Sequence, residues 1–148
     1  MVSQKCQYAL RAVFELAKFY GHGPVKIADI AEAEAIPPRF LEVILGQLKQ
    51  AGFVESRRGK EGGYLLARPP GLLTVGEVMR FVEGPLAPVN CVGGETKDLC
   101  PLHGNCVFLG MWERANRAVS SVYDGTTFQD LLDEDKRRTG TLVLSYSI

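Results

Sequence analysis

The sequence has 148 residues, enough for one domain or for one domain with an extension that joins two copies. Hydrophobic residues make up 46% of the chain and its mean hydropathy is close to zero, so it can bury an ordinary core and is not a disordered protein. No apolar run approaches the roughly 20 residues that a membrane span needs. Charges interrupt the apolar stretch at the N-terminus, which argues against a secretory signal. We therefore expect a cytoplasmic protein with no membrane partner.

The zero net charge conceals an uneven distribution. Residues 1–68 contain ten Lys and Arg against seven Asp and Glu, a net charge of +3. Residues 69–148 contain seven against ten, a net charge of −3. Phosphate binding needs a local basic surface rather than a basic total, so the first half modestly favours a nucleic-acid partner.

Three helices are predicted in the N-terminal part of the chain. Apolar residues recur every three or four positions over residues 3–20, and a Gly-rich turn ends this helix. A shorter helix is predicted over residues 26–35. Proline fits the first turn of a helix, so Pro37-Pro38 predicts a third helix over residues 38–50.

A β-hairpin and a fourth helix are predicted next. Two short apolar segments flank a charged, Gly-rich turn within residues 53–67, which is typical of a hairpin. Pro69-Pro70-Gly71 then breaks the chain. Thr74 and Glu77 have the spacing of a capping box and predict a helix that runs to about Glu83.

The remaining third of the chain begins with a long loop. Residues 84–105 show little periodicity, and a loop of this length is uncommon unless it is functional or disordered. A helix is predicted over residues 108–122, followed by a short helix over residues 128–138 and an extended end over residues 141–144. Five apolar residues of the 108–122 helix form a seam at near-heptad spacing, which favours dimerisation over a role in the core: Phe108, Trp112, Ala115, Val119 and Val122.

Three helices followed by a hairpin form the plan of a winged helix-turn-helix. We therefore expect a mostly α fold with a small β-hairpin wing and a long dimerisation helix. In this plan the third helix enters the major groove of double-stranded DNA. Arg39 and Phe40 lie where base edges or thymine methyls would be read, and Glu42 could accept a hydrogen bond from a cytosine amino group. The alternative is a solvated polar helix face.

The turn of the hairpin combines cations with glycines. Arg57, Arg58 and Lys60 would attract phosphates, and the glycines would allow the backbone to approach them closely. The alternative is a loop that its charges keep soluble.

Three of the four cysteines, Cys91, Cys100 and Cys106, fall within sixteen residues, whereas Cys6 stands alone. In a reducing compartment such a cluster indicates metal or redox chemistry rather than disulfides. Three thiolates can hold an iron–sulfur cluster and leave one coordination site for another group. With His103 they also make a Cys3His set that suits zinc, and a thiol switch without metal is a third possibility. Spacing alone favours neither metal.

Four segments resemble the winged-helix repressors of the IscR/NsrR/CymR type, over about residues 3–123. They are KCQYALRAV, KIADIAEAEAIPPRFLEVILGQLKQAGFVESRRGKEGGYLLARPP, LTVGEVMRFVEG and the three-cysteine loop. The resemblance implies a homodimer that binds palindromic operators and senses iron–sulfur status, nitric oxide, iron or cysteine supply. By position it implies recognition-helix roles for Arg39, Phe40 and Glu42. It also implies that a wing carrying Arg58, Lys60 and Gly62 enters the minor groove.

The resemblance favours a [2Fe-2S] or [4Fe-4S] cluster over zinc on Cys91, Cys100 and Cys106, but it leaves the fourth ligand open. Some relatives have a histidine three residues after the last cysteine, where this chain has Leu109. Others have an acid on the first helix of the partner subunit, where this chain has Gln7. His103 or Cys6 could take that place instead. The interval between the first two cysteines is also longer than in most members.

These interpretations divide the chain into three units. Residues 1–83 form the DNA-binding domain, residues 84–106 the cluster loop, and residues 107–148 the dimerisation helix with a C-terminal tail. A small iron–sulfur electron carrier or cluster-delivery protein is the rival from another functional class, but it would leave the basic hairpin unexplained. The sequence contains no catalytic constellation, so no enzyme is expected.

Overall fold

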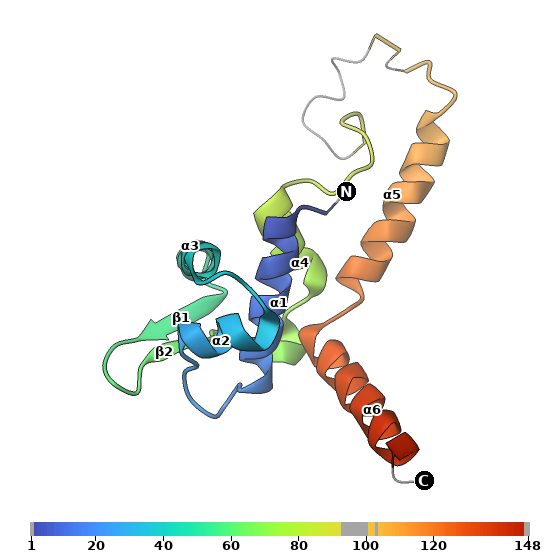
Figure 1. Cartoon of the computed structure of the whole chain (residues 1–148). Helices are drawn as coiled ribbons and strands as arrows, with labels where there is room; N and C mark the ends of the chain where they lie inside the picture. Colours follow the sequence, from blue (N-terminus) through green and yellow to red (C-terminus); the bar gives the residue numbers. More distant parts are fainter. Residues whose placement is uncertain (1, 93–100, 103, 147–148) are drawn as a thin grey trace.

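The computed structural model describes residues 2–92, 101–102 and 104–146. Six helices, one 3-10 turn and a two-stranded antiparallel hairpin make up this part of the chain, which confirms the predicted mostly α, winged helix-turn-helix fold (Figure 1). The elements are α1 (Gln4–Lys18), α2 (Ile27–Glu34), α3 (Pro38–Gln50), β1 (Val54–Arg57), β2 (Gly63–Leu66), η1 (Pro70–Leu72), α4 (Val75–Glu83), α5 (Leu109–Asp124) and α6 (Phe128–Tyr146). Within these residues, no helix is both long and apolar enough to cross a bilayer.

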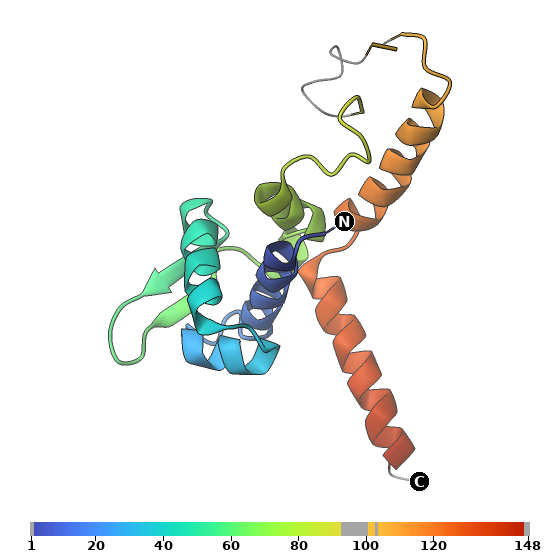
Figure 2. The ribbon, with the colours of Figure 1, turned by 45° about the horizontal axis from the view of Figure 1, so that its top comes forward.

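Helix α1 forms the centre of the molecule. The hydroxyl of Ser3 accepts a hydrogen bond from the Cys6 backbone N–H at 3.1 Å and caps the helix. One face of α1 buries small and branched apolar side chains, which lets α2, α3, α4 and α6 all pack against it (Figure 2). The buried side chains of this face are Ala9, Ala12, Val13, Leu16 and Ala17.

The turn between α2 and α3 depends on one left-handed residue. Ala35 has φ 53° and ψ 49°, and the N–H of the following Ile36 donates to the Ala31 carbonyl at 3.0 Å. This geometry ends α2 and buries Ile36 in the core. Pro38 then occupies the first turn of α3, as the sequence predicts.

The hairpin pairs Val54 with Leu66 and Arg57 with Gly63. A further bridge joins it to the segment before α2, since the backbone groups of Val25 and Tyr64 exchange hydrogen bonds of 2.7 and 2.8 Å. This bridge fixes the hairpin against the helix-turn-helix.

The cap of α4 follows the prediction in part. The Thr74 hydroxyl accepts from the Glu77 N–H at 3.2 Å, but the Glu77 carboxylate pairs with Arg68 at 2.9 Å. Phe128, at the start of α6, lies fully buried in the core that α1 and α4 share.

The predicted extended end over residues 141–144 is wrong, because α6 continues to Tyr146. No proline or turn separates this segment from the helix before it, and Gly140 alone does not stop the helix. Adding residues to an existing helix requires no new nucleation, and of residues 141–144 only Thr141 and Val143 favour strands, while Leu142 and Leu144 favour helix.

The left-handed turn at Ala35 generates a stability prediction. Removing the Cβ should relieve a backbone strain of about 1 kcal/mol. The greater conformational freedom of glycine in the unfolded chain offsets part of this gain in stability. Ala35→Gly should therefore stabilise the protein by about 0.5 kcal/mol in urea unfolding at fixed protein concentration. The matched control Ala33→Gly, inside α2, should destabilise it by about 1 kcal/mol. An Ala35→Gly protein as destabilised as the control would contradict the turn geometry.

Candidate DNA interface and cysteine loop

Helix α3 has one buried and one open face. Its inward side chains, Leu41, Ile44, Leu45 and Leu48, are buried against α1 and the hairpin. The predicted recognition residues Arg39, Phe40 and Glu42 are all exposed. Figures 1 and 2 show α3 and the hairpin on the same side of the molecule, away from α5 and α6.

Sequence reasoning missed one residue of this open face. Val43 is 59% exposed, although apolar side chains usually lie inward. The signal was available, because Val43 falls outside the stripe formed by Leu41, Ile44, Leu45 and Leu48.

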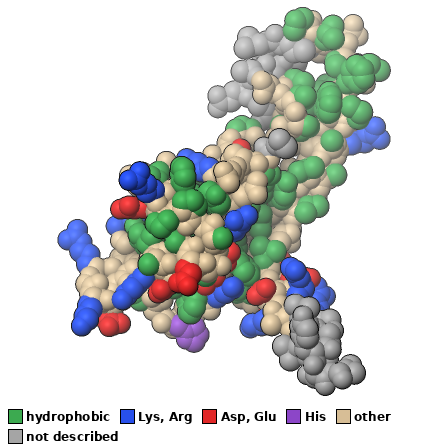
Figure 3. Space-filling model, in the orientation of Figure 1, with side chains coloured by type: hydrophobic (Ala, Val, Ile, Leu, Met, Phe, Trp, Pro, Cys, Tyr) green, Lys and Arg blue, Asp and Glu red, His purple; other side chains and the backbone are tan. Residues whose placement is uncertain are grey.

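The hairpin turn places its cations in solvent. Arg57, Arg58 and Lys60 are exposed, and Figure 3 shows Lys and Arg side chains around the tip of the hairpin. The turn closes where the Gly62 N–H donates to the Gly59 carbonyl at 3.0 Å.

Gly62 cannot be replaced without moving this turn. A Cβ at Gly62 would lie 2.2 Å from the Arg57 carbonyl oxygen. The neighbouring Gly63 has φ 155°, and a Cβ there would lie 2.3 Å from the Val25 carbonyl oxygen. Both glycines are therefore required by close backbone contacts within the chain, whatever the hairpin binds.

The predicted cysteine ligands lie around the loop between α4 and α5. Cys91 and Cys106 are partly buried, and Cys106 lies three residues before α5. Cys100 and His103 lie outside the described residues. Among the residues that are described, no three His, Cys, Asp or Glu side chains gather as a metal site.

The candidate ligands on α1 differ sharply in accessibility. The Cys6 side chain is fully buried, and burial, followed by the charge of Glu83 and a hydrogen bond to it, raises the pKa of the Cys6 thiol to about 11. The Gln7 side chain is exposed, and its amide donates to the Val2 carbonyl at 3.3 Å. The structure therefore exposes Gln7 at the surface and directs Cys6 into the core.

The end of α5 is fixed to the beginning of α4. The Val75 N–H donates to the Thr126 carbonyl at 2.9 Å, and the Phe128 N–H donates to the Leu73 carbonyl at 3.0 Å. Arg80 of α4 forms a two-bond ion pair with Asp124, the last residue of α5, and this hydrogen bonding lowers the pKa of the Asp124 carboxyl. These contacts leave the α5–α6 turn little freedom.

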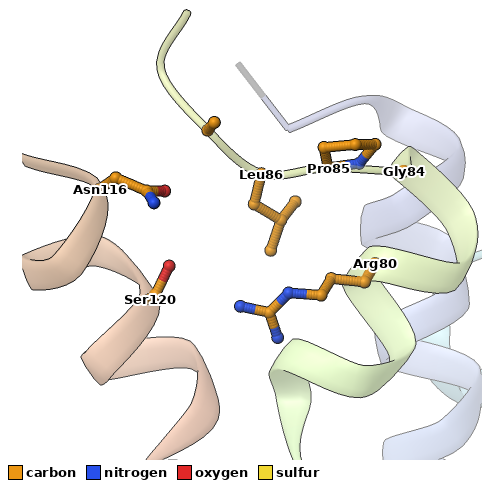
Figure 4. A pocket seen from close by; sticks show the side chains of 7 residues that line it. Arg80, Gly84, Pro85, Leu86, Asn116 and Ser120 are labelled. Carbon is orange, nitrogen blue, oxygen red and sulfur yellow. The ribbon is translucent and has the colours of Figure 1, made fainter. Parts of the chain in front are cut away.

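Toward the other end of α5 the two helices separate. Residues 84–87 pass between them, and a cavity of about 390 Å³ opens beside Leu86 (Figure 4). Arg80 reaches into it from α4, and Asn116 and Ser120 face it from α5. A second hollow, which Leu86 also lines, is bordered by Ala115 and Val119, two residues of the predicted dimer seam. Phe108 and Val122 of the same seam are exposed.

The Rrf2 family model, described as an iron-dependent transcriptional regulator, matches residues 2–134. The chain belongs to the Rrf2 family. It is 36% identical over 130 residues to the HTH-type transcriptional regulator CymR of Bacillus subtilis, a match that covers 88% of each protein. The chain is thus similar throughout to DNA-binding transcription regulators, and like the rest of this family it is a regulator and not an enzyme.

Solved structures of Rrf2 regulators confirm the fold. The structure of CymR of B. subtilis, titled the global cysteine regulator of that organism, has a TM-score of 0.75 at 34% identity and covers 90% of this chain and 97% of its own. The structure of IscR of T. potens has a TM-score of 0.74 at 33% identity, and the match covers 91% of this chain and 88% of IscR. The resemblance to the IscR/NsrR/CymR type is confirmed.

Proposed function

We propose that this Rrf2 regulator is a homodimeric repressor that binds a palindromic operator and senses redox, nitric oxide or iron status through an iron–sulfur cluster. The observation that carries the proposal is the position of the cysteine loop. Cys91 and Cys106 both lie in the loop that joins α4, in the DNA-binding unit, to α5: Cys91 is eight residues after the end of α4, and Cys106 is three residues before the start of α5. A group bound by this loop would fix the position of α5 relative to α4, and in a dimer formed through α5 this position affects DNA binding.

The donor chemistry fits a cluster. Iron in such clusters is bound by thiolates, and Cys91 and Cys106 retain solvent access, as exchangeable cluster ligands would. Together with Cys100 they would hold the cluster, which would supply a group that reacts with oxidants and nitric oxide.

The fourth ligand comes from a short set of candidates. Burial and the raised pKa argue against Cys6, because a ligand must be a thiolate within reach of the metal. Gln7 is accessible to a partner subunit but carries a weak amide ligand. We therefore favour His103, within the loop itself.

A thiol switch is the second candidate function. The similarity to CymR, the global cysteine regulator of B. subtilis, favours this function. Zinc bound by Cys91, Cys100, His103 and Cys106 would be structural and would leave the signal to another group.

On the DNA side, we assign α3 to the major groove and the hairpin to the minor groove. Arg39, Phe40 and Glu42 would contact bases, while Arg57, Arg58, Lys60 and the Gly62 backbone would contact phosphates or the minor-groove floor. The exposure of these cations and the shared side of α3 and the hairpin support this assignment.

The assignment of Lys60 to a phosphate can be tested by salt titration. Lys60→Ala should weaken binding to operator and random duplexes alike, and should reduce the slope of log K against log salt by about one, because one fewer counterion is released. The control Lys136→Ala, on α6, should leave the slope unchanged. An unchanged slope with an altered operator preference would show that Lys60 reads bases.

The seam on α5 generates a prediction about assembly. Trp112 is half-buried and lies beside the exposed Phe108, so Trp112→Glu should place a carboxylate in the interface and yield a monomer in light scattering. Ser121→Glu adds the same charge to another face of α5 and should remain a dimer. A folded Trp112→Glu dimer at micromolar concentration would exclude this seam.

Cys100→Ala tests the cluster itself. The variant should lose visible absorption, iron and sulfide after anaerobic purification, whereas Cys6→Ala should keep all three, since Cys6 faces its own core. The affinity of Cys100→Ala for the operator should change several-fold, while its salt-dependent binding to random duplexes should remain. Full iron and sulfide content in Cys100→Ala would exclude the loop as the cluster site. Loss of stoichiometric zinc with unfolding would establish the Cys3His zinc site instead.

A further inference from the structure

The open face of α3 carries two bulky apolar side chains. Phe40 is 60% exposed and Val43 is 59% exposed, whereas Leu41, Ile44, Leu45 and Leu48 on the opposite face are buried. Residues three apart are neighbours on a helix surface, so Phe40 and Val43 form one apolar surface. Val43 lies on the line of the helix directly opposite the core, one turn after Arg39.

The same line continues to a glycine that the chain itself does not require. Gly46 lies in the interior of α3, where glycine destabilises a helix by about 0.5–1 kcal/mol relative to alanine. Its φ is not positive, and a Cβ built on it would meet no atom of the described part of the chain within 4 Å. In this respect Gly46 differs from Gly62 and Gly63, whose Cβ atoms would collide with backbone. The open space at Gly46 would let another molecule approach the helix backbone there, and unlike the similarly open Gly140 of α6, Gly46 lies on the same side of α3 as Arg39 and Val43.

The chemistry around this face identifies the approaching molecule as DNA. Arg39 lies on the same line of the helix, and the exposed Arg58 and Lys60 of the hairpin lie on the same side of the molecule (Figures 1 and 3). Cations beside an apolar surface suit a DNA major groove, which combines phosphates at its rims with thymine methyls on its floor.

We propose that Phe40 and Val43 contact the C5 methyl groups of thymines, and that the backbone at Gly46 is the point where α3 comes closest to the DNA. This inference rests on the proposed function, in which α3 enters the major groove. It makes the operator half-site thymine-rich opposite the middle of α3. It also makes Val43 a specificity residue beside Arg39 and Glu42.

Uracil substitution tests the methyl contacts directly. Duplexes selected from a random library by the full-length protein would be resynthesised with one thymine at a time replaced by uracil, which lacks only the methyl group. At the contacted positions affinity should fall about fourfold per methyl, the value for one buried methyl-sized group. Val43→Ala should bind more weakly and lose its sensitivity at one of these positions. The control Leu72→Ala, which removes an apolar side chain 67% exposed on η1, should retain the wild-type pattern.

Gly46→Ala separates the DNA contact from a role in folding. The variant should have a higher thermal midpoint, because alanine is the better helix residue, and yet bind the selected duplexes about tenfold more weakly, a loss on the scale of one base contact. Gly140→Ala, in α6, also has open space at its Cβ and should raise the midpoint without changing affinity. Wild-type affinity in Gly46→Ala would overturn the close approach at Gly46.

The failure of this inference can be distinguished from the failure of the proposed function. Tight binding of selected duplexes that is insensitive to uracil at every thymine would overturn the methyl contacts and assign the apolar face to a protein partner, while leaving DNA binding intact. Failure to bind any selected or random duplex would overturn both.

Discussion

The attachment of the α5–α6 turn to the beginning of α4 is the constraint on which the arrangement of the whole molecule depends. Two backbone hydrogen bonds, from Val75 to Thr126 and from Phe128 to Leu73, join segments that are far apart in the sequence. The Arg80–Asp124 ion pair adds a link between side chains, and the buried ring of Phe128 adds apolar contact. One end of α5 is therefore part of the DNA-binding unit.

The other end of α5 has no comparable attachment in the described residues. There residues 84–87 pass between the helix and α4, and two hollows share Leu86 in their linings. The cysteine loop starts at the end of α4 and returns to the start of α5, so a group that closes the loop would fix this second end. If two copies join through α5, the angle between α4 and α5 sets the separation of the two recognition helices. A molecule that binds the loop then changes operator affinity only to the extent that it binds one angle between α4 and α5 more tightly than another.

Much of this organisation was predictable because it follows from local chemistry. Periodicity placed α1, α2, α3 and α5, the capping-box spacing of Thr74 and Glu77 placed α4, Pro38 marked the start of α3, and the glycines of the hairpin marked its turn. The features that the sequence did not reveal depend on contacts between residues far apart in the sequence, or on space that no side chain fills. The burial of Phe128 is a distant contact, since only the folded chain brings residue 128 against α1 and α4.

The interface shows the same division. The exposure of Arg39, Phe40 and Glu42 was predictable because they fall outside the apolar stripe of α3. The same pattern places Val43 outside the stripe, but Val43 was overlooked because valine is usually a core residue. The role proposed for Gly46 needed the observation that no atom of the described residues occupies the space beside it. The choice between Cys6 and Gln7 likewise needed their burial, because adjacent residues of a helix point in different directions.

In the proposed dimer, a group bound in the cysteine loop would set the separation of the two recognition helices. The most direct test is the distance between the two copies of residue 33, on the exposed side of α2, measured by pulsed electron paramagnetic resonance with spin labels on a non-cysteine amino acid introduced there. We expect one narrow distance distribution for the anaerobically purified dimer and a shifted or broadened distribution after the bound group is removed. Identical distributions in the two states, with operator affinity still changed, would contradict it.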